Sequence, residues 1–376
     1  MFLALREIRR AKIRFGLLVA AVGLLVLLIL GQQAIQNGLI TSFVGGIERQ
    51  SAPVLVYSVD GQRTFQGSVI TPDLELAVRK VDGVEEAGRI GQGTFTVRVA
   101  GQDGDSDAAI LGYGRPGLGA PDSLSAGRLP SRPGEAVGSS AGFDLGDRVE
   151  VLPAGAPTGE STSITVVGIA DRAQILVTPT LFVAWPDYVT AVRSVNPDAT
   201  QVLPSALGVR PVAGVAPEAR AGRITRADPD ADALTRAEAA EKTPGVAEVR
   251  SSFQVIFLLF GLVVPLTTGL FFLIVTLQKA RSLTLLRAIG ARRAVLVRSL
   301  MLQVALVVGA GLALGIAAYV PLTQLTLGDV ALSFDLAAVV FWSVLFMALG
   351  LLSALLAARR VMAIDPIEAT VSEGSV

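Results

Sequence analysis

The sequence predicts an integral membrane α-helical protein: four transmembrane helices, with a large extracytoplasmic α+β domain inserted between helices 1 and 2. Of the 376 residues, 51% are hydrophobic and 17% are charged, which is too apolar for an ordinary soluble enzyme of this length. Four apolar runs each reach the ~20 helical residues that cross a bilayer. Only the first two runs are separated by a long polar stretch, which is rich in Gly and Pro.

The charges predict the orientation of the spans. Residues 48–250 contain 26 acidic and 19 basic side chains, whereas the N-terminal segment, the 279–298 loop and the C-terminal tail together contain 13 basic and four acidic ones. Lys and Arg beside spans stay in the cytoplasm, while a large domain is translocated whatever its charge. We therefore expect both termini and the 279–298 loop to be cytoplasmic and the large domain to lie outside.

The elements follow from these patterns in chain order. The N-terminal segment has apolar residues on one side and Arg on the other, which is typical of an interfacial helix and equally of a simple topology determinant. No A-x-A-like site follows Leu30, so a retained anchor is favoured over a cleaved signal peptide. The predicted segments are an amphipathic helix at 1–14, helix 1 at 15–40, the outer domain at 41–250, helix 2 at 251–278, a cytoplasmic loop at 279–294, helix 3 at 295–322, an outer loop at 323–335, helix 4 at 336–358 and a cytoplasmic tail at 359–376.

The outer domain alternates strand and helix signals and is expected to form one or two lobes. A Gly/Asp-rich stretch at 101–107 predicts a hairpin or loop tip, and 213–245 predicts a helix-containing subdomain. The β-rich segments are 54–59, 94–100, 149–152 and 163–169, and the helical ones are 74–81 and 186–192.

The residues that the chain lacks exclude much enzymology. It has no Cys and no His, so disulfides and the commonest metal ligand and general base are absent. A P-loop requires a lysine in G-x-x-x-x-G-K-[ST], and none of the four lysines, Lys12, Lys80, Lys242 and Lys279, follows a glycine. We expect no catalytic, metal or cofactor-binding residue in this chain, and any energy from ATP to come from a partner.

Two features of the spans concern helix packing. Gly311 and Gly315 have G-x-x-x-G spacing in the third span, which permits close helix contact either within one subunit or across a dimer. Pro265 in the second span predicts a kink, which would also suit a hinge.

Three stretches carry a family resemblance: LALREIRRAK before the first span, TLLRAIGARR in the 279–298 loop, and AARRVMAIDPIEA at the C-terminal end. With this order of spans, the chain resembles the FtsX/MacB-type permeases, the mechanotransmission (type VII) class of ABC transporters. The segment AGRLPSRPGEAVGSSAGFDLGDRVEV followed by ITVVGI is similar to the outer core of that family. The start of the chain and the loop look most like the HrtB-like haem-export and DevC-like permeases.

The resemblance implies that the 279–298 loop contains a coupling helix, which seats in a cleft of a separate ATPase. An apolar stripe flanked by arginines suits that role, and Gly290 is placed to end the helix. An interfacial helix that only obeys the positive-inside rule is the alternative. Relatives often have an acidic residue where this chain has Ser282, so an ion pair there cannot be carried over. The proposed coupling residues are Arg281, Leu285, Leu286, Arg287, Ile289, Arg292 and Arg293.

The resemblance also implies partners, location and function. We expect a homodimer with two ATPase subunits that bind ATP and Mg, no cofactor in this chain and no nucleic acid, in a bacterial plasma (inner) membrane. The expected function is ATP-driven expulsion of a hydrophobic or amphiphilic compound, such as haem, a lipid or a drug-like molecule, from the membrane. The alternatives are an FtsX-like transmitter that activates a cell-wall hydrolase, and a membrane-anchored structural protein, which would leave the TLLRAIGARR loop unexplained.

The outer end of the first span is the candidate substrate entrance. Four amides follow a purely apolar run there, with two of them at i, i+4 on one helix face. Amides that merely meet lipid headgroups are the alternative. Haem has little support at residue level, because His and Cys are absent. The four amide residues are Gln32, Gln33, Gln36 and Asn37.

Overall fold

The computed structural model describes residues 12–153, 162–278, 293–324, 326–327, 330–332 and 334–362. These residues fall into two compact units. The helical unit contains the described parts of 12–36, 252–325 and 332–362, and the α+β unit contains the described parts of 37–251 and 326–331. Each unit is described separately below.

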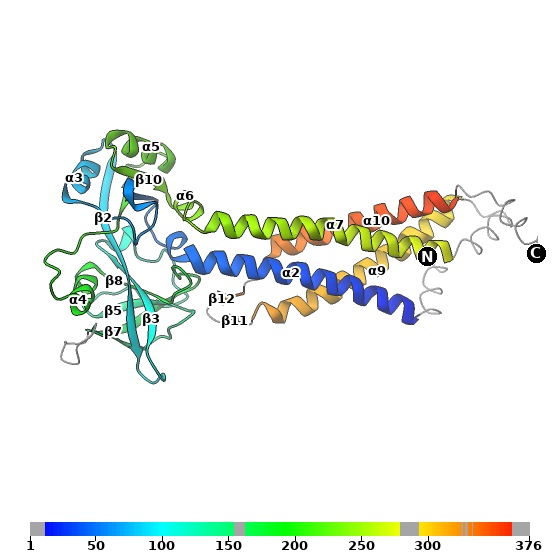
Figure 1. The fold of residues 1–376 in the computed structure, drawn as a ribbon, viewed down its shortest axis with the longest axis horizontal. Helices are drawn as coiled ribbons and strands as arrows, with labels where there is room; N and C mark the ends of the chain where they lie inside the picture. The colour runs from blue at the N-terminus through cyan, green and yellow to red at the C-terminus, as the bar shows by residue number, and fades with distance from the viewer. Residues whose placement is uncertain are drawn as a thin grey trace, which may run out of the picture. The chain divides into compact units, whose positions relative to one another are not determined.

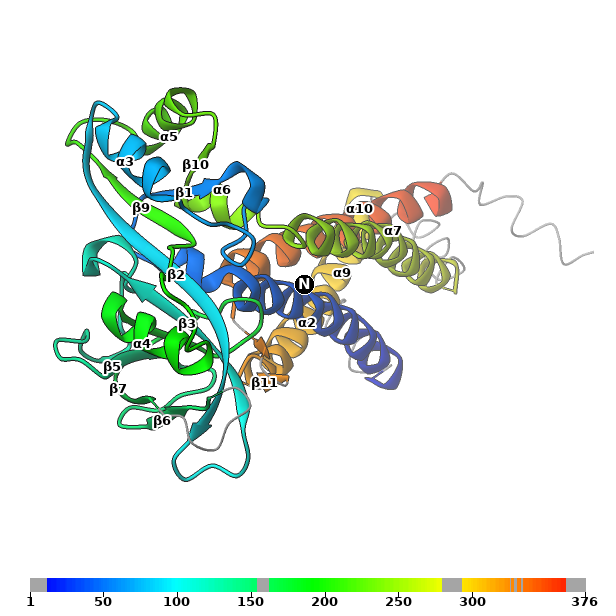
Figure 2. The ribbon, with the colours of Figure 1, turned by 60° about the vertical axis from the view of Figure 1, so that its left-hand side comes forward.

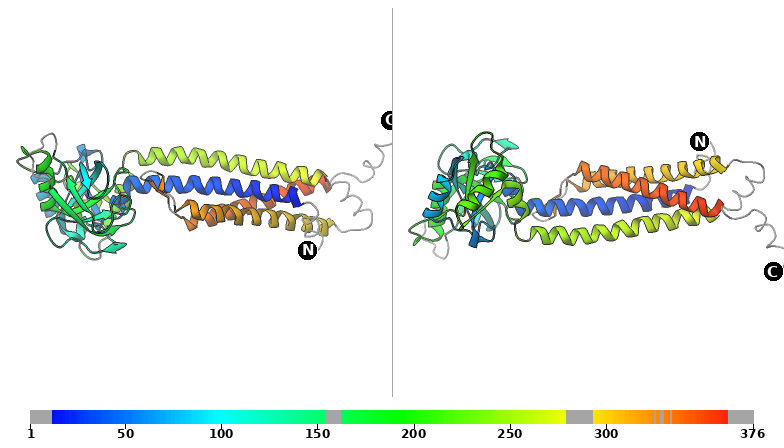
Figure 3. Two further views of the ribbon diagram at one scale, coloured as in Figure 1. Left: turned by 90° about the horizontal axis from the view of Figure 1, so that it is seen from below. Right: turned by 90° about the horizontal axis from the view of Figure 1, so that it is seen from above.

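The helical unit contains the four predicted spans. Four helices are long and apolar enough to cross a membrane, and their membrane segments run alongside one another (Figure 3). Most buried side chains of this unit come from three of the helices, with Ile29, Val308 and Trp342 as examples. The predicted membrane fold class is therefore confirmed. The helices are α2 (Lys12–Glu48), α7 (Val246–Gln278), α9 (Arg293–Leu322) and α10 (Leu336–Met362).

All four helices are longer than the sequence predicted, and two of them, α2 and α7, extend into residues that were assigned to the outer domain. Helix α2 continues to Glu48 instead of ending at residue 40, and α7 begins at Val246 instead of residue 251. With 37 residues, α2 is about 55 Å long at ~1.5 Å per residue, well beyond the ~30 Å of a bilayer core. The extra turns were missed because the prediction stopped where the hydropathy falls, whereas the helix continues to bury Val44 and Ile47 in the α+β unit.

The α+β unit is built on one ten-stranded sheet in the order β10-β1-β9-β2-β3-β8-β5-β7-β4, with β6 pairing to both β2 and β7. Strand β2 is 16 residues long and belongs to two lobes, as Figure 2 shows. Its first half pairs with β9 and its second half with β3 and β6. The prediction of an α+β domain is confirmed, and its sheet forms two lobes, where the sequence left one or two open. Strand β2 spans Val84–Val99 and the short β4 spans Ala126–Gly127.

In the first lobe, helices α3 and α5 cover one face of β10, β1, β9 and the start of β2 (Figure 1). Strand β1 alternates between the two faces, as a strand must: Val54 and Val56 face α3 and α5, and Leu55 and Tyr57 face a second core that includes the end of α2. The elements are β1 (Val54–Ser58), the 3-10 turn η1 (Val59–Gly61), α3 (Pro72–Lys80), β9 (Ala206–Pro211), α5 (Pro217–Ala227), β10 (Ala231–Thr235) and α6 (Arg236–Glu241).

In the second lobe, β2, β3, β8, β5, β7 and β6 pair in a closed ring, which leaves these strands no free edge. Helix α4 packs Tyr188 against the ring where Gly91 and Gly112 lack a side chain, because a Cβ at either position would overlap the tyrosine. The elements are β3 (Ser106–Tyr113), η2 (Pro116–Leu118), β5 (Glu135–Ser139), β6 (Arg148–Val151), β7 (Thr162–Ala170), β8 (Thr180–Ala184) and α4 (Trp185–Val195).

The strands predicted at 54–59, 94–100, 149–152 and 163–169 and the helices at 74–81 and 186–192 are confirmed as β1, the end of β2, β6, β7, α3 and α4. Strands β3, β4, β5, β8, β9 and β10 were missed. Strand β5 is buried at every position, and strands buried on both faces show no alternation of apolar and polar residues. A short hairpin of β11 (Thr326–Leu327) and β12 (Val330–Ala331) occupies the predicted outer loop.

Candidate functional site

The candidate site is the helix junction, which we define as residues 37–48 of α2, helix α6 and residues 246–251 of α7, all within the α+β unit. Helix α6 begins at a capping box in which Thr235 and Glu238 satisfy each other's backbone N–H groups. The hydrogen bond from the Thr235 backbone lowers the pKa of Glu238. This local signal determines where the six-residue helix starts, and so places its side chains opposite the end of α2.

The last turns of α2 are held by the connection between β7 and β8. The Gly46 N–H donates to the Gln174 carbonyl at 2.7 Å, and the Leu176 and Val177 N–H groups donate to the carbonyls of Phe43 and Ser42 at 2.9 and 2.8 Å. Backbone groups at a helix end need partners outside the helix, and here the connecting segment supplies them. The end of α2 is thus part of the outer core and not a free linker.

This contact depends on close backbone approach and on an unusual loop conformation. A Cβ on Gly45 would lie closer than 3.0 Å to the Arg172 carbonyl group, and one on Gly46 would overlap Ile175. Arg172, Leu176 and Val177 have φ angles of 56°, 53° and 61°, a region that non-glycine residues occupy at a cost of order 1–3 kcal/mol. The hydrogen bonds to α2 hold this strained loop in place.

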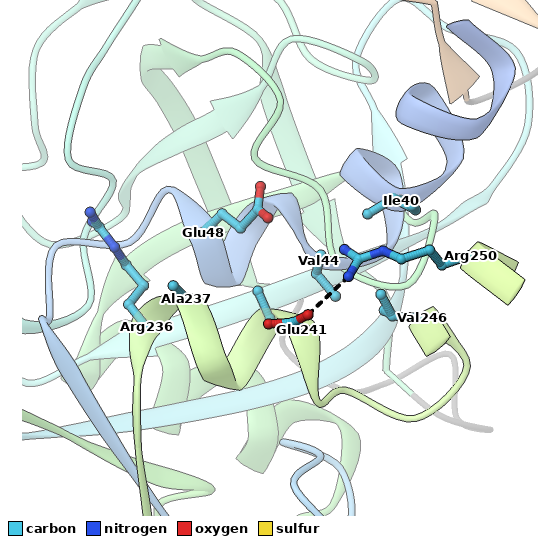
Figure 4. A pocket seen from close by; sticks show the side chains of 9 residues that line it. Ile40, Val44, Glu48, Arg236, Ala237, Glu241, Val246 and Arg250 are labelled. Atoms are coloured by element: carbon cyan, nitrogen blue, oxygen red, sulfur yellow. Dashed lines mark hydrogen bonds and ion pairs between the residues drawn. The ribbon is translucent and has the colours of Figure 1, made fainter. Parts of the chain in front are cut away.

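A pocket of about 380 Å³ opens at the helix junction. Figure 4 shows the side chains that line it, contributed by the end of α2, helix α6 and the start of α7. Its floor is aliphatic and its rim carries two arginines and two glutamates. The lining residues are Ile40, Val44, Glu48, Arg236, Ala237, Ala240, Glu241, Val246 and Arg250.

Most charges on the rim are already paired. Arg250 of α7 binds Glu241 of α6 at 3.0 Å, as the dashed line in Figure 4 shows. Arg236 donates to the Gln50 carbonyl at 2.6 Å and pairs with Asp122 at 3.0 Å. Glu48 is exposed, and among the described residues its carboxylate makes no hydrogen bond or ion pair. The pocket therefore presents one unpaired negative charge.

The four predicted entrance amides lie on α2 near the point where the two units divide. Gln33 donates a hydrogen bond from Nε2 to Oε1 of Gln36 at 3.2 Å. This pair is spaced i, i+3, whereas the sequence analysis placed Gln33 and Asn37 together at i, i+4. Gln36 is buried, with 7% of its surface exposed, while Gln32, Gln33 and Asn37 are half-buried. Their role as a substrate entrance stays a prediction.

The G-x-x-x-G glycines face another helix of the same chain. A Cβ on Gly311 would come within 2.6 Å of Val22, and one on Gly315 within 2.7 Å of Val26. Both glycines of α9 therefore lie against α2 inside the helical unit. The close approach of the backbones lets the two helices gain dispersion contacts in an environment where the hydrophobic effect does not drive association.

No family model matches the chain. Uncharacterized ABC transporter permeases of Mycobacterium tuberculosis and Mycobacterium bovis are 26% identical to it over 377 residues, which covers 97% of this chain and 98% of theirs. The chain resembles an ABC transporter permease. The family resemblance predicted from the sequence is thus confirmed at this level, and it agrees with a location in the membrane.

Two solved structures are similar to about half of the permease-like chain. The periplasmic region of MacB from Actinobacillus actinomycetemcomitans is 10% identical, with a TM-score of 0.35, and covers 53% of this chain and 95% of its own. The extracellular domain of the noncanonic ABC-type transporter YknZ from Gram-positive bacteria is 12% identical, with a TM-score of 0.32, and covers 48% of this chain and 99% of its own.

The predicted ATPase-coupling residues of this permease-like chain lie almost entirely outside the described part. Arg293 is the first residue of α9. Residues 1–11 of the amphipathic helix predicted at 1–14 also lie outside the described part, and residues 12–14 belong to α2. In the described residues, no group of three or more His, Cys, Asp or Glu side chains could hold a metal ion. The coupling residues outside the described part are Arg281, Leu285, Leu286, Arg287, Ile289 and Arg292.

Sequence reasoning missed the helix junction. The Gly45-Gly46 pair stands in an otherwise helix-compatible run, and adjacent glycines in such a run indicate close packing or a break. The glycine pair was therefore a sequence signal for close packing at the end of α2. The pairing of Arg250 with Glu241 and the free carboxylate of Glu48 had no sequence signal, because they depend on how α2, α6 and α7 pack.

Proposed function

We propose that this chain is the permease subunit of an ABC transporter that expels a hydrophobic or amphiphilic compound by mechanotransmission. A separate ATPase, which binds and hydrolyses ATP, docks on the 279–294 loop. The spans transmit the resulting movement to the α+β unit. The resemblance to ABC transporter permeases along nearly the whole chain supports the class, and the absence of a P-loop lysine supports a separate source of energy.

The observation that carries the transmission step is the continuity of α2. One unbroken helix, Lys12–Glu48, has its first 25 residues in the helical unit and its last 12 in the α+β unit. Its end is bonded to the β7–β8 connection and buried in the outer core through Val44 and Ile47. A displacement of such a helix acts on the core to which it is bonded, since packed cores do not deform continuously.

The proposal includes two copies of the chain. Four spans enclose no obvious path, and α7 has the least buried span of the four, with 6% of its window buried. Leu258, Leu262 and Leu266, at i, i+4 and i+8 on one face of α7, are exposed by 74%, 68% and 68%. Lipid or a second subunit would cover this apolar face. In the proposed homodimer, the second subunit contacts it.

The test is purification of the full-length tagged chain from its native membrane, followed by an assay of ATP hydrolysis in the eluate. We expect an ATPase to co-purify, and Leu286→Asp with Ile289→Asp to remove it, because charges in an apolar stripe prevent its burial in a groove. Leu145→Asp, at an exposed leucine of the α+β unit, is the matched control and should retain the ATPase. An eluate without ATP hydrolysis would contradict the assignment.

Export is tested separately. The complex is reconstituted in vesicles loaded with a fluorescent amphiphile in the bilayer, and ATP is added. ATP-dependent loss of the dye supports export. Stimulated ATP hydrolysis without loss of any of a panel of amphiphiles would instead support transmission of a signal to an outer hydrolase, and would contradict export.

A further inference from the structure

We propose that the pocket at the helix junction binds a small cationic amphiphile, with the Glu48 carboxylate recognising its positive charge. The pocket has the two components that such a ligand needs. Ile40, Val44, Ala240 and Val246 form an aliphatic floor, and one carboxylate on the rim is unpaired among the described residues.

The sign of the ligand's charge follows from the pairing of the rim. The positive charges of Arg236 and Arg250 are each engaged by a carboxylate at 3.0 Å, and Arg236 also donates to a backbone carbonyl. An anionic ligand would have to break one of these pairs and would lie beside Glu48. A cationic group meets Glu48 without breaking either pair, and a charge-assisted hydrogen bond is about twice as strong as a neutral one.

The size of the pocket limits the rest of the ligand. Its volume of about 380 Å³ is near the lower end of the ~300–1,000 Å³ typical of small-molecule sites. A single aromatic or short aliphatic body with one amine fits this space, whereas a large planar dicarboxylate such as haem is disfavoured by both size and charge. Among the amphiphilic compounds that the proposed function allows, the pocket therefore favours small cationic ones.

Both transmembrane connections of the α+β unit contribute to the pocket. Glu48 lies in the last turn of α2, and Arg250 lies in the second turn of α7. A ligand held between them and α6 would favour whichever arrangement of the two helices fits it, because a ligand shifts an equilibrium by its differential affinity for the two states. That the bound compound is the exported one rests on the function proposed above, but the binding itself does not.

The experiment measures binding of 1-naphthylmethylammonium to the full-length chain in nanodiscs of zwitterionic lipid by equilibrium dialysis, with empty nanodiscs as the blank. The probe has about a dozen non-hydrogen atoms, enough for measurable affinity in an apolar pocket. We expect saturable binding to the wild type and about tenfold weaker binding to Glu48→Gln, the loss that one charge-assisted contact predicts. Glu85→Gln, which removes an exposed carboxylate from β2, should bind like the wild type.

A second pair of variants tests the pocket independently of charge. Ala237→Phe places a ring at the exposed rim of the pocket on α6 and should abolish binding, whereas Ala219→Phe at an exposed position of α5 should not. Unchanged thermal unfolding shows that each variant is folded. Equal binding of 1-naphthylacetate, or an unchanged affinity of Glu48→Gln, would overturn the proposal. No ATPase is present in this assay, so its failure is distinguishable from failure of the proposed permease function.

Discussion

Gly45 of α2 and Arg172 of the β7–β8 connection approach each other so closely that no side chain fits between them. A Cβ on Gly45 would lie closer than 3.0 Å to the Arg172 carbonyl group, and Arg172 itself adopts a left-handed φ of 56°. The neighbouring Gly46 N–H donates to the Gln174 carbonyl at 2.7 Å. This backbone-to-backbone contact is what fixes the end of the first membrane helix in the α+β unit.

Gly45→Ala should destabilise the protein by about 1–3 kcal/mol, because the added methyl forces two backbones apart in a packed region. Gly16→Ala is the matched control in the same helix, since a Cβ there meets nothing within 4 Å. Thermal unfolding in one detergent compares the two. If Gly45→Ala unfolds at the wild-type temperature, the contact with Arg172 does not hold α2.

Gly311→Ala should weaken the packing of α9 on α2, because the new methyl would overlap Val22. We expect a loss of about 1–3 kcal/mol by the same overpacking argument. Gly309→Ala, whose nearest neighbour would be Met347 Cε at 3.9 Å, should be tolerated. Unfolding in a titration of denaturing detergent measures both variants. Equal sensitivity of the two would argue against a close α9–α2 contact at Gly311.

The Arg128–Glu135 pair should make stability fall in acid. The Arg128 guanidinium, with help from the Ser131 and Arg132 N–H groups, lowers the pKa of Glu135 to about 2. An unfolded glutamate has a pKa of about 4.3, so the folded state binds fewer protons. The stabilisation is therefore complete above about pH 4.3 and is lost as the pH falls towards the folded value.

Glu135→Gln removes this pH-dependent contribution. The melting temperature of the wild type should exceed that of Glu135→Gln at pH 6, and the difference should shrink as the pH falls from about 4.5 to about 2. Glu85→Gln, with the same chemical change at an exposed position of β2, controls for net charge. A difference that is constant across this range, or that grows in acid, would contradict the assigned pairing.

Gln33→Leu with Asn37→Leu tests the predicted substrate entrance. If these amides contact a compound that enters from the membrane, the double variant loses one or two hydrogen bonds of ~0.5–1.5 kcal/mol each. The concentration of compound that gives half-maximal stimulation of ATP hydrolysis should then change by at least about twofold. Gln102→Leu, at an exposed hairpin tip, is the control. An unchanged response would favour amides that only meet lipid headgroups.

The four spans and the α+β class could be predicted from the chain because their signals are local. A run of ~20 apolar residues indicates a transmembrane helix whatever its surroundings. Helix α3 was predicted from its own short helical pattern, and the structure shows that Thr71 caps it. Strands such as β5 could not be found. Their burial on both faces is a property of the finished sheet and leaves no alternation in the sequence.

The sequence alone predicted four membrane spans and showed that the chain has no P-loop lysine. Both conclusions rest on hydropathy and short motifs, which are local and do not depend on tertiary contacts. The sequence could not locate the helix junction. Whether Gly45 meets Arg172, and whether Glu48 faces the same pocket as Ala237, depends on segments more than a hundred residues apart coming together. Such contacts arise from the packing of the whole outer core, and packing is decided by the complementary shapes of its parts and not by the pattern of any one segment.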